Sequence, residues 1–183
     1  TIDDFVAKSG GVVGPHTFYA LPGRLLISGL SNATDGGGKT ALVEYSNQGE
    51  HVRTIWMPEG AEYGYDLRVN ADLNRMLTSS FTGRNNYMRP LGELMQDAEA
   101  MQRFGNTMVV WDYHTRKPLQ TLTVPGAPLE IRWALNPKDN WAVTATALTS
   151  KIWLVKPDGK GGWQAKDVAT IGDPSKIPLP VDI

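Results

Sequence analysis

Cysteine is absent from this chain of 183 residues, and histidine occurs only three times. The lack of cysteine excludes disulfide scaffolds, cysteine-based zinc sites, iron–sulfur ligation and thiol catalysis. Metal chemistry made by this chain alone would depend on the imidazoles of His16, His51 and His114. His51 and His114 fall in apparent turns, where a solvated histidine needs no functional explanation.

Long apolar runs and an excess of one charge are also absent. No run approaches the roughly 20 apolar residues of a membrane span, so we expect no membrane partner. With 18 Lys+Arg against 19 Asp+Glu, the chain has no electrostatic footprint for a polyanion, so we expect no nucleic-acid partner. The start at Thr1 has neither an initiator Met nor the basic region of a signal peptide, which indicates a processed or cut chain.

Turn-forming residues are abundant, with 19 Gly and 12 Pro, and they separate short β-rich runs. This pattern is typical of an all-β sandwich, barrel or propeller. A repeat favours the propeller, because three units each predict four strands in roughly 40–50 residues, the period of a propeller blade. We place these blades at about 12–57, 62–125 and 128–171, with the start of the next blade at 178–183.

An insertion interrupts the second unit at about 88–104. Its apolar residues recur at helical spacing and follow Pro90, which predicts a single amphipathic helix packed against one end of the blade. These apolar residues are Leu91, Leu94, Met95, Ala98, Met101 and Phe104.

Three blades cannot close a ring, and an open set would leave two unpaired edges. We therefore expect either further blades in the same polypeptide or a homo-oligomer of several copies that closes the ring together.

Four polar residues stand at the predicted entrances to the first strand of each unit. They are His16, Asp66, Glu130 and Asp182, spaced 50, 64 and 52 residues apart. If the blades superpose, these side chains line one mouth of the central channel, where they could bind a divalent metal or shift one another's pKa values. The alternative for the carboxylates is hydrogen bonding to backbone between blades. Trp111 and Trp153 share a place in the third strands, so we expect them to pack between blades.

Several ordered motifs resemble the selenium-binding protein / methanethiol oxidase family. The resemblance runs from about residue 14 to the end and includes the insertion, while the segments 77–83 and 172–178 are similar to the bacterial branch. The motifs are GPHT at 14–17, YGYD at 63–66, GNTMVVWD at 105–112, PLEIR at 128–132 and IPLPVDI at 177–183.

The resemblance implies a seven-bladed propeller more than twice this length, of which this chain is a central fragment of about three blades. It implies a copper-dependent oxidase that converts methanethiol with O2 and water to formaldehyde, hydrogen sulfide and hydrogen peroxide. By motif match, only His16 carries over as a copper ligand. We predict that Glu130, Asp66 and Asp182 move protons beside it. Resemblance to bacterial members implies a periplasmic protein.

An alternative function remains open, since a propeller fold does not fix activity. The chain could belong to a non-catalytic propeller scaffold, or to a selenium- or metal-binding protein without oxidase activity. A metal bound at His16 separates the scaffold from the oxidase.

Overall fold

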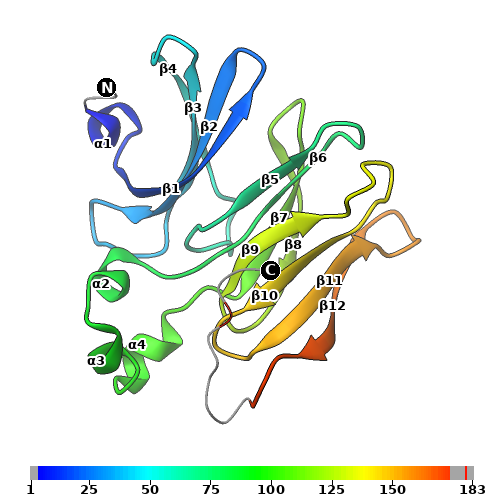
Figure 1. The fold of residues 1–183 in the computed structure, drawn as a ribbon. Coiled ribbons are helices and arrows are strands. Elements are labelled where there is room, and N and C mark those ends of the chain that lie inside the picture. Colours follow the sequence, from blue (N-terminus) through cyan, green and yellow to red (C-terminus); the bar gives the residue numbers. More distant parts are fainter. Residues whose placement is uncertain (1–3, 174–179, 181–183) are drawn as a thin grey trace.

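The computed structural model describes residues 4–173 and 180, in which three four-stranded antiparallel sheets lie side by side (Figure 1). In each sheet the spatial order of the strands equals their order in the chain, and a short helix, α1 (Phe5–Lys8), precedes the first sheet. The prediction of an all-β fold made of propeller blades is confirmed. The predicted start of a fourth blade at 178–183 lies outside the described residues except for Pro180.

The strands are β1 (Val12–Leu21), β2 (Arg24–Asn32), β3 (Ala41–Ser46) and β4 (His51–Trp56); β5 (Leu67–Asn70), β6 (Arg75–Thr78), β7 (Thr107–Asp112) and β8 (Lys117–Thr123); and β9 (Pro128–Trp133), β10 (Ala142–Thr146), β11 (Lys151–Pro157) and β12 (Trp163–Thr170).

The middle sheet is buried on both faces. Adjacent residues of a strand point to opposite faces, so Met76 packs with Leu26 and Leu42 of the first sheet, while Leu77 packs with the third sheet. Along the inner side, β1 contacts β5 and β5 contacts β9. The sheets are therefore stacked like neighbouring blades, with their first strands together.

The two tryptophans of the third strands pack between sheets, as predicted. Trp111 is fully buried in the core between the first and second sheets, and its Nε1 donates to Thr78 Oγ1 at 3.0 Å. Trp153 packs against the core between the second and third sheets.

The prediction of a single helix in the insertion is wrong. Three short helices lie between β6 and β7, namely α2 (Arg84–Tyr87), α3 (Leu91–Leu94) and α4 (Ala98–Gln102) (Figure 1). Pro90 and Asp97 interrupt the helical path because both have extended backbone, with ψ of 131° and 100°. Asp97 then begins a new helix by accepting a hydrogen bond from Ala100 N at 3.0 Å.

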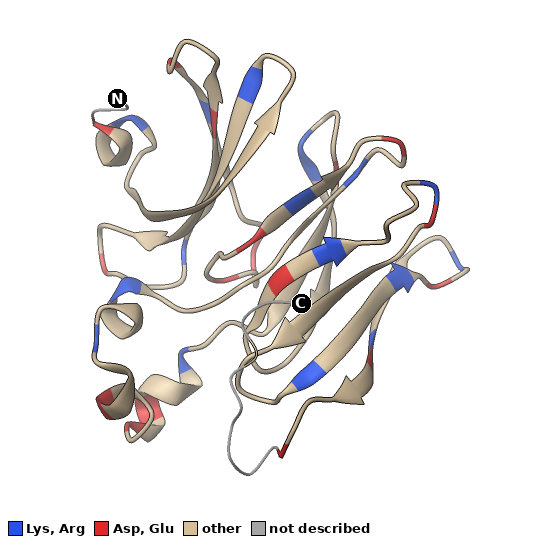
Figure 2. Ribbon diagram, viewed as in Figure 1, with Lys and Arg blue, Asp and Glu red and all other residues tan. Residues whose placement is uncertain are grey.

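Basic and acidic residues are interspersed along the ribbon of the blades (Figure 2). In the described part of the chain, every helix is too short to cross a membrane.

Candidate functional site

His16 lies within β1 at a β-bulge, rather than in a loop before the strand as predicted. Pro15 pairs with Gly29 and Phe18 pairs with Ile27, so His16 and Thr17 together oppose the single residue Ser28. A bulge of this kind changes the direction of a side chain and is common next to active sites. The half-buried His16 ring lies against the Tyr65 ring, with 3.9 Å between the ring centroids.

The strand register corrects the predicted equivalence of the entrance residues by one position. In the third sheet, Leu129 and Glu130 together oppose Ala145, and in the second sheet Asp66 stands opposite Ser79. Residue 17, and not residue 16, is therefore equivalent to Asp66 and Glu130. His16 is equivalent to Leu129, the first residue of the same bulge in the third sheet, and to Tyr65 in the second.

Asp66 joins the three sheets. Its fully buried carboxylate accepts hydrogen bonds from Thr17 Oγ1 of the first sheet at 2.9 Å and from Ile131 N of the third sheet at 2.8 Å. Leu67 N also donates to it at 2.9 Å, and Arg68 Nε lies 3.1 Å away. Burial raises the pKa of Asp66 to about 6, although the Ile131 N–H and the Arg68 charge oppose this rise. For Asp66, the structure thus contains the hydrogen bonding between blades that the sequence left as an alternative.

Two serines form a repeated joint between neighbouring sheets. Ser28 Oγ accepts from Thr17 N at 3.1 Å and donates to the Tyr65 carbonyl of the next sheet. Ser79 Oγ accepts from Asp66 N at 3.1 Å and donates to the Leu129 carbonyl. The same hydroxyl geometry therefore holds Tyr65 at the seam between the first and second sheets, where it lies beside His16. It holds Leu129 at the seam between the second and third sheets.

Glu130 is the partly exposed carboxylate of the group, with 17% of its side chain accessible. Its Oε2 accepts from Arg68 Nη2 and from Arg132 Nη1, each at 2.9 Å. Burial opposes the ionisation of Glu130, but the hydrogen bonds from Arg132 and Arg68 outweigh it and lower the pKa. Glu130 is thus an ionised carboxylate at neutral pH.

The hydrogen bonds around Thr17 assign the protons of the His16 ring. A hydroxyl has one proton, and Thr17 Oγ1 has two acceptors for it, Asp66 Oδ1 at 2.9 Å and the Tyr65 carbonyl at 3.3 Å, so toward His16 Nδ1, 3.3 Å away, the hydroxyl is an acceptor. In this assignment Nδ1 has the proton and Nε2 has a lone pair. Burial lowers the pKa of His16 against the opposing charge of Glu130, which keeps the ring neutral at pH 7, the form that coordinates metals.

At this site the described residues provide one metal ligand, the Nε2 nitrogen of His16. Among residues 4–173 and 180, no group of three or more His, Asp or Glu side chains is arranged to hold an ion. Asp182, the third predicted carboxylate, lies outside the described residues. The donor set fits copper as a partial site, because neutral imidazole is a copper ligand and a histidine that ligates usually donates its other N–H to a neighbour, as here to Thr17.

Sequence reasoning missed Thr17, Tyr65 and Arg68 as members of the site. Ser28 and Ser79 stand at matching places in the repeated units, which is a signal for the joint. The stacking of Tyr65 on His16 had no such signal, because it depends on the bulge.

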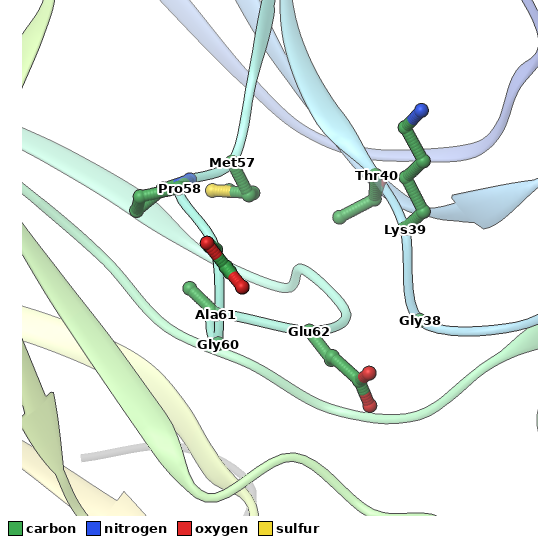
Figure 3. A pocket seen from close by; sticks show the side chains of 9 residues that line it. Gly38, Lys39, Thr40, Met57, Pro58, Gly60, Ala61 and Glu62 are labelled. Carbon is green, nitrogen blue, oxygen red and sulfur yellow. The ribbon is translucent and has the colours of Figure 1, made fainter.

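A pocket of about 260 Å³ lies beside the segment that connects the first sheet to the second (Figure 3). Residues 38–40 and 57–62 line it, and Lys39 and Glu62 point away from each other. The Lys39 ammonium instead lies 4.9 Å from the centre of the Trp56 ring. This pocket contains none of the predicted site residues.

Comparison with known proteins gives one family over nearly the whole chain. The profile of the 56kDa selenium binding protein (SBP56) matches residues 1–179. The chain is 58% identical to a protein named methanethiol oxidase from Ruegeria pomeroyi and 61% identical to one from Hyphomicrobium sp. Both alignments cover 100% of this chain but only 45% and 42% of those proteins, so the chain spans less than half their length.

Solved structures show the same fold at lower sequence identity. A hypothetical selenium-binding protein from Sulfolobus tokodaii has a TM-score of 0.69 and 22% identity, over 86% of this chain and 36% of that one. A periplasmic gluconolactonase from Pseudomonas aeruginosa has a TM-score of 0.51 and 11% identity, over 82% of this chain and 40% of that one.

Proposed function

This chain belongs to the 56kDa selenium binding protein family, and on that premise we propose that it is part of a copper-dependent methanethiol oxidase. The proposed reaction converts methanethiol, O2 and water to formaldehyde, hydrogen sulfide and hydrogen peroxide. The name of the two bacterial relatives supports the activity. The observation on which the proposal depends is that His16 Nδ1 faces Thr17 Oγ1 at 3.3 Å, which assigns the lone pair of the neutral ring to Nε2.

His16 would hold copper through Nε2, together with ligands from outside the described residues. Copper at such a site supplies a soft centre for the thiolate and passes electrons to O2. Thr17 and Asp66 keep the ring in the required tautomer. The Thr17 hydroxyl donates a hydrogen bond to the Asp66 carboxylate, so the hydroxyl oxygen accepts a hydrogen bond from Nδ1. The Tyr65 ring packs against the imidazole at an interplanar angle of 33° and restricts its rotation.

Glu130 is the first candidate for moving protons in this reaction. Its carboxylate is partly exposed and ionised and can accept a proton that the substrate releases, while Arg68 and Arg132 lower its pKa and weaken it as a base. Asp66 is a weaker candidate because donors from three sheets surround its carboxylate. Asp182 stays a candidate from the sequence alone.

The proposal extends to the setting of the reaction. The small-molecule thiol and O2 are the partners, and the remaining propeller blades complete the ring, either within the same polypeptide or in a homo-oligomer. The resemblance to bacterial members supports a periplasmic location and a role in sulfur metabolism.

Elemental analysis of the full-length protein, freshly purified without chelators, tests this function. We expect near-stoichiometric copper, and we expect His16→Ala to lower copper content and thiol-dependent peroxide formation together. His114→Ala is the matched control, because His114 is an exposed histidine in a turn, and it should change neither quantity. Protein without a transition metal, or copper unchanged in His16→Ala, would contradict the proposal and favour the scaffold or a selenium-binding function.

A further inference from the structure

An apolar pocket of about 200 Å³ lies beside the His16 site, at the end of the blades where the insertion packs. Three aromatic rings line it, those of Tyr65, Phe81 and Phe104, and the rings follow one another at centroid distances of 5.5 and 5.4 Å. Tyr65 also stacks on His16, so the Tyr65 ring is shared by the pocket and the proposed metal ligand.

Aliphatic side chains complete the wall. Leu94 and Leu129 are almost fully buried, at 3% and 2% exposure, whereas Leu91 at the rim is 57% exposed. Leu91 and Leu94 both come from α3, and among the three described sheets only the middle one has inserted helices. The insertion therefore builds one side of this pocket.

The chemistry of the lining restricts what the pocket can bind. No charged side chain lines it, so an anion or a metal ion would find no partner there. Apolar cavities of about 150 Å³ in proteins stay dry and take up small apolar molecules such as benzene or xenon. Sulfur atoms also make favourable contacts with aromatic rings. A neutral alkyl thiol combines these properties, since it is small, apolar and contains sulfur.

We propose that this pocket is an entry site that holds the neutral short-chain alkyl thiol before the thiol reaches His16, with the Tyr65 ring as the partition between the two places. The inference rests on the proposed oxidase function and adds to it the place where the substrate is captured. An entry site affects capture more than chemistry, so changes in the pocket should alter KM and leave kcat nearly unchanged.

Xenon binding to the full-length protein, followed by 129Xe NMR, tests the pocket without relying on activity or copper. We expect saturable xenon binding in the unmodified protein and loss of that binding in Ala147→Leu, because Ala147 lines the pocket and is 3% exposed. Absence of saturable xenon binding in the unmodified protein would overturn the proposal.

Kinetics with methanethiol supply the second measurement. Filling the pocket with Ala147→Leu, or its rim with Leu91→Phe, should raise KM by about four- to tenfold with kcat and copper content unchanged. Leu119→Phe is the matched control, because Leu119 is a 50% exposed leucine on β8 outside the pocket, and it should leave KM unchanged. Leu91→Phe guards against misfolding of Ala147→Leu, since its side chain is at the surface.

Leu94→Ala enlarges the pocket and should raise kcat/KM for 1-propanethiol relative to methanethiol by about threefold or more. An active, copper-loaded enzyme whose KM and thiol preference do not respond to these variants would overturn the entry site and leave the oxidase standing. Unmodified protein that neither holds copper nor oxidises methanethiol would instead refute the oxidase, and the entry site with it, while saturable xenon binding would then indicate a cavity for small apolar molecules only.

Discussion

The seam between the first and second sheets and the seam between the second and third sheets share one backbone joint but differ in their side chains. Ser28 makes the joint at the first seam and Ser79 makes it at the second. The first seam places His16 on the Tyr65 ring, whereas the second seam has Leu129 in the place of His16 and the Arg68–Glu130 ion pair beside it. The comparison shows that the joint is repeated while the residue at the bulge differs, His16 in the first sheet and Leu129 in the third.

Removing the carboxylate that spans both seams should have the largest effect. Asp66→Ala leaves Thr17 Oγ1, Ile131 N and Leu67 N without this acceptor, which should lower the free energy of unfolding by roughly 3–5 kcal/mol. Asp66→Asn keeps one acceptor oxygen and should cost less. Urea unfolding of the full-length protein measures both variants. Asp72→Ala, at an exposed aspartate in the β5–β6 turn, is the control, and an equal loss there would remove the special role of Asp66.

Replacing the two serines distinguishes the contribution of the joint to stability from its contribution to copper binding. Ser28→Ala and Ser79→Ala should each lower the free energy of unfolding by about 1–3 kcal/mol, because each removes a hydrogen bond to a buried N–H and a second one to a carbonyl of the next sheet. Only Ser28→Ala should also reduce copper content. Ser28 hydrogen-bonds to Thr17, which follows His16 in the chain, and to Tyr65, whose ring lies against His16. Equal copper loss in Ser79→Ala would mean that the two seams do not differ in function.

The last prediction concerns the pH dependence of stability. The folded-state pKa of Asp66 is about 6, above its ordinary value of 3.8, so the folded protein binds this proton more tightly than the unfolded chain. The resulting contribution to stability is complete below pH 3.8 and is lost as the pH rises through 6. The difference in unfolding free energy between wild type and Asp66→Asn should therefore decrease across this range. A difference that increases with pH would show that the folded state favours the ionised carboxylate.

The sequence predicted the features that depend on short-range pattern. Strand positions follow from alternating apolar residues between turns, and the equivalent places of Trp111 and Trp153 follow from the repeat. The single helix failed because Pro90 and Asp97 each take extended backbone, which apolar spacing alone does not detect. Within the candidate site, the group of residues was found but His16 was aligned one position off, because matching polar residues at strand entrances does not fix the strand register.

Since one carboxylate binds backbone or side chains of all three sheets, the sheets cannot turn independently of one another. A rotation of the third sheet that withdraws Ile131 N from Asp66 would also shift the acceptor that orients Thr17. The Thr17 hydroxyl faces His16 Nδ1, so the direction of the imidazole lone pair is linked to the angle between the blades. If His16 holds the proposed copper ion, the affinity for that ion therefore depends on the orientation of the blades.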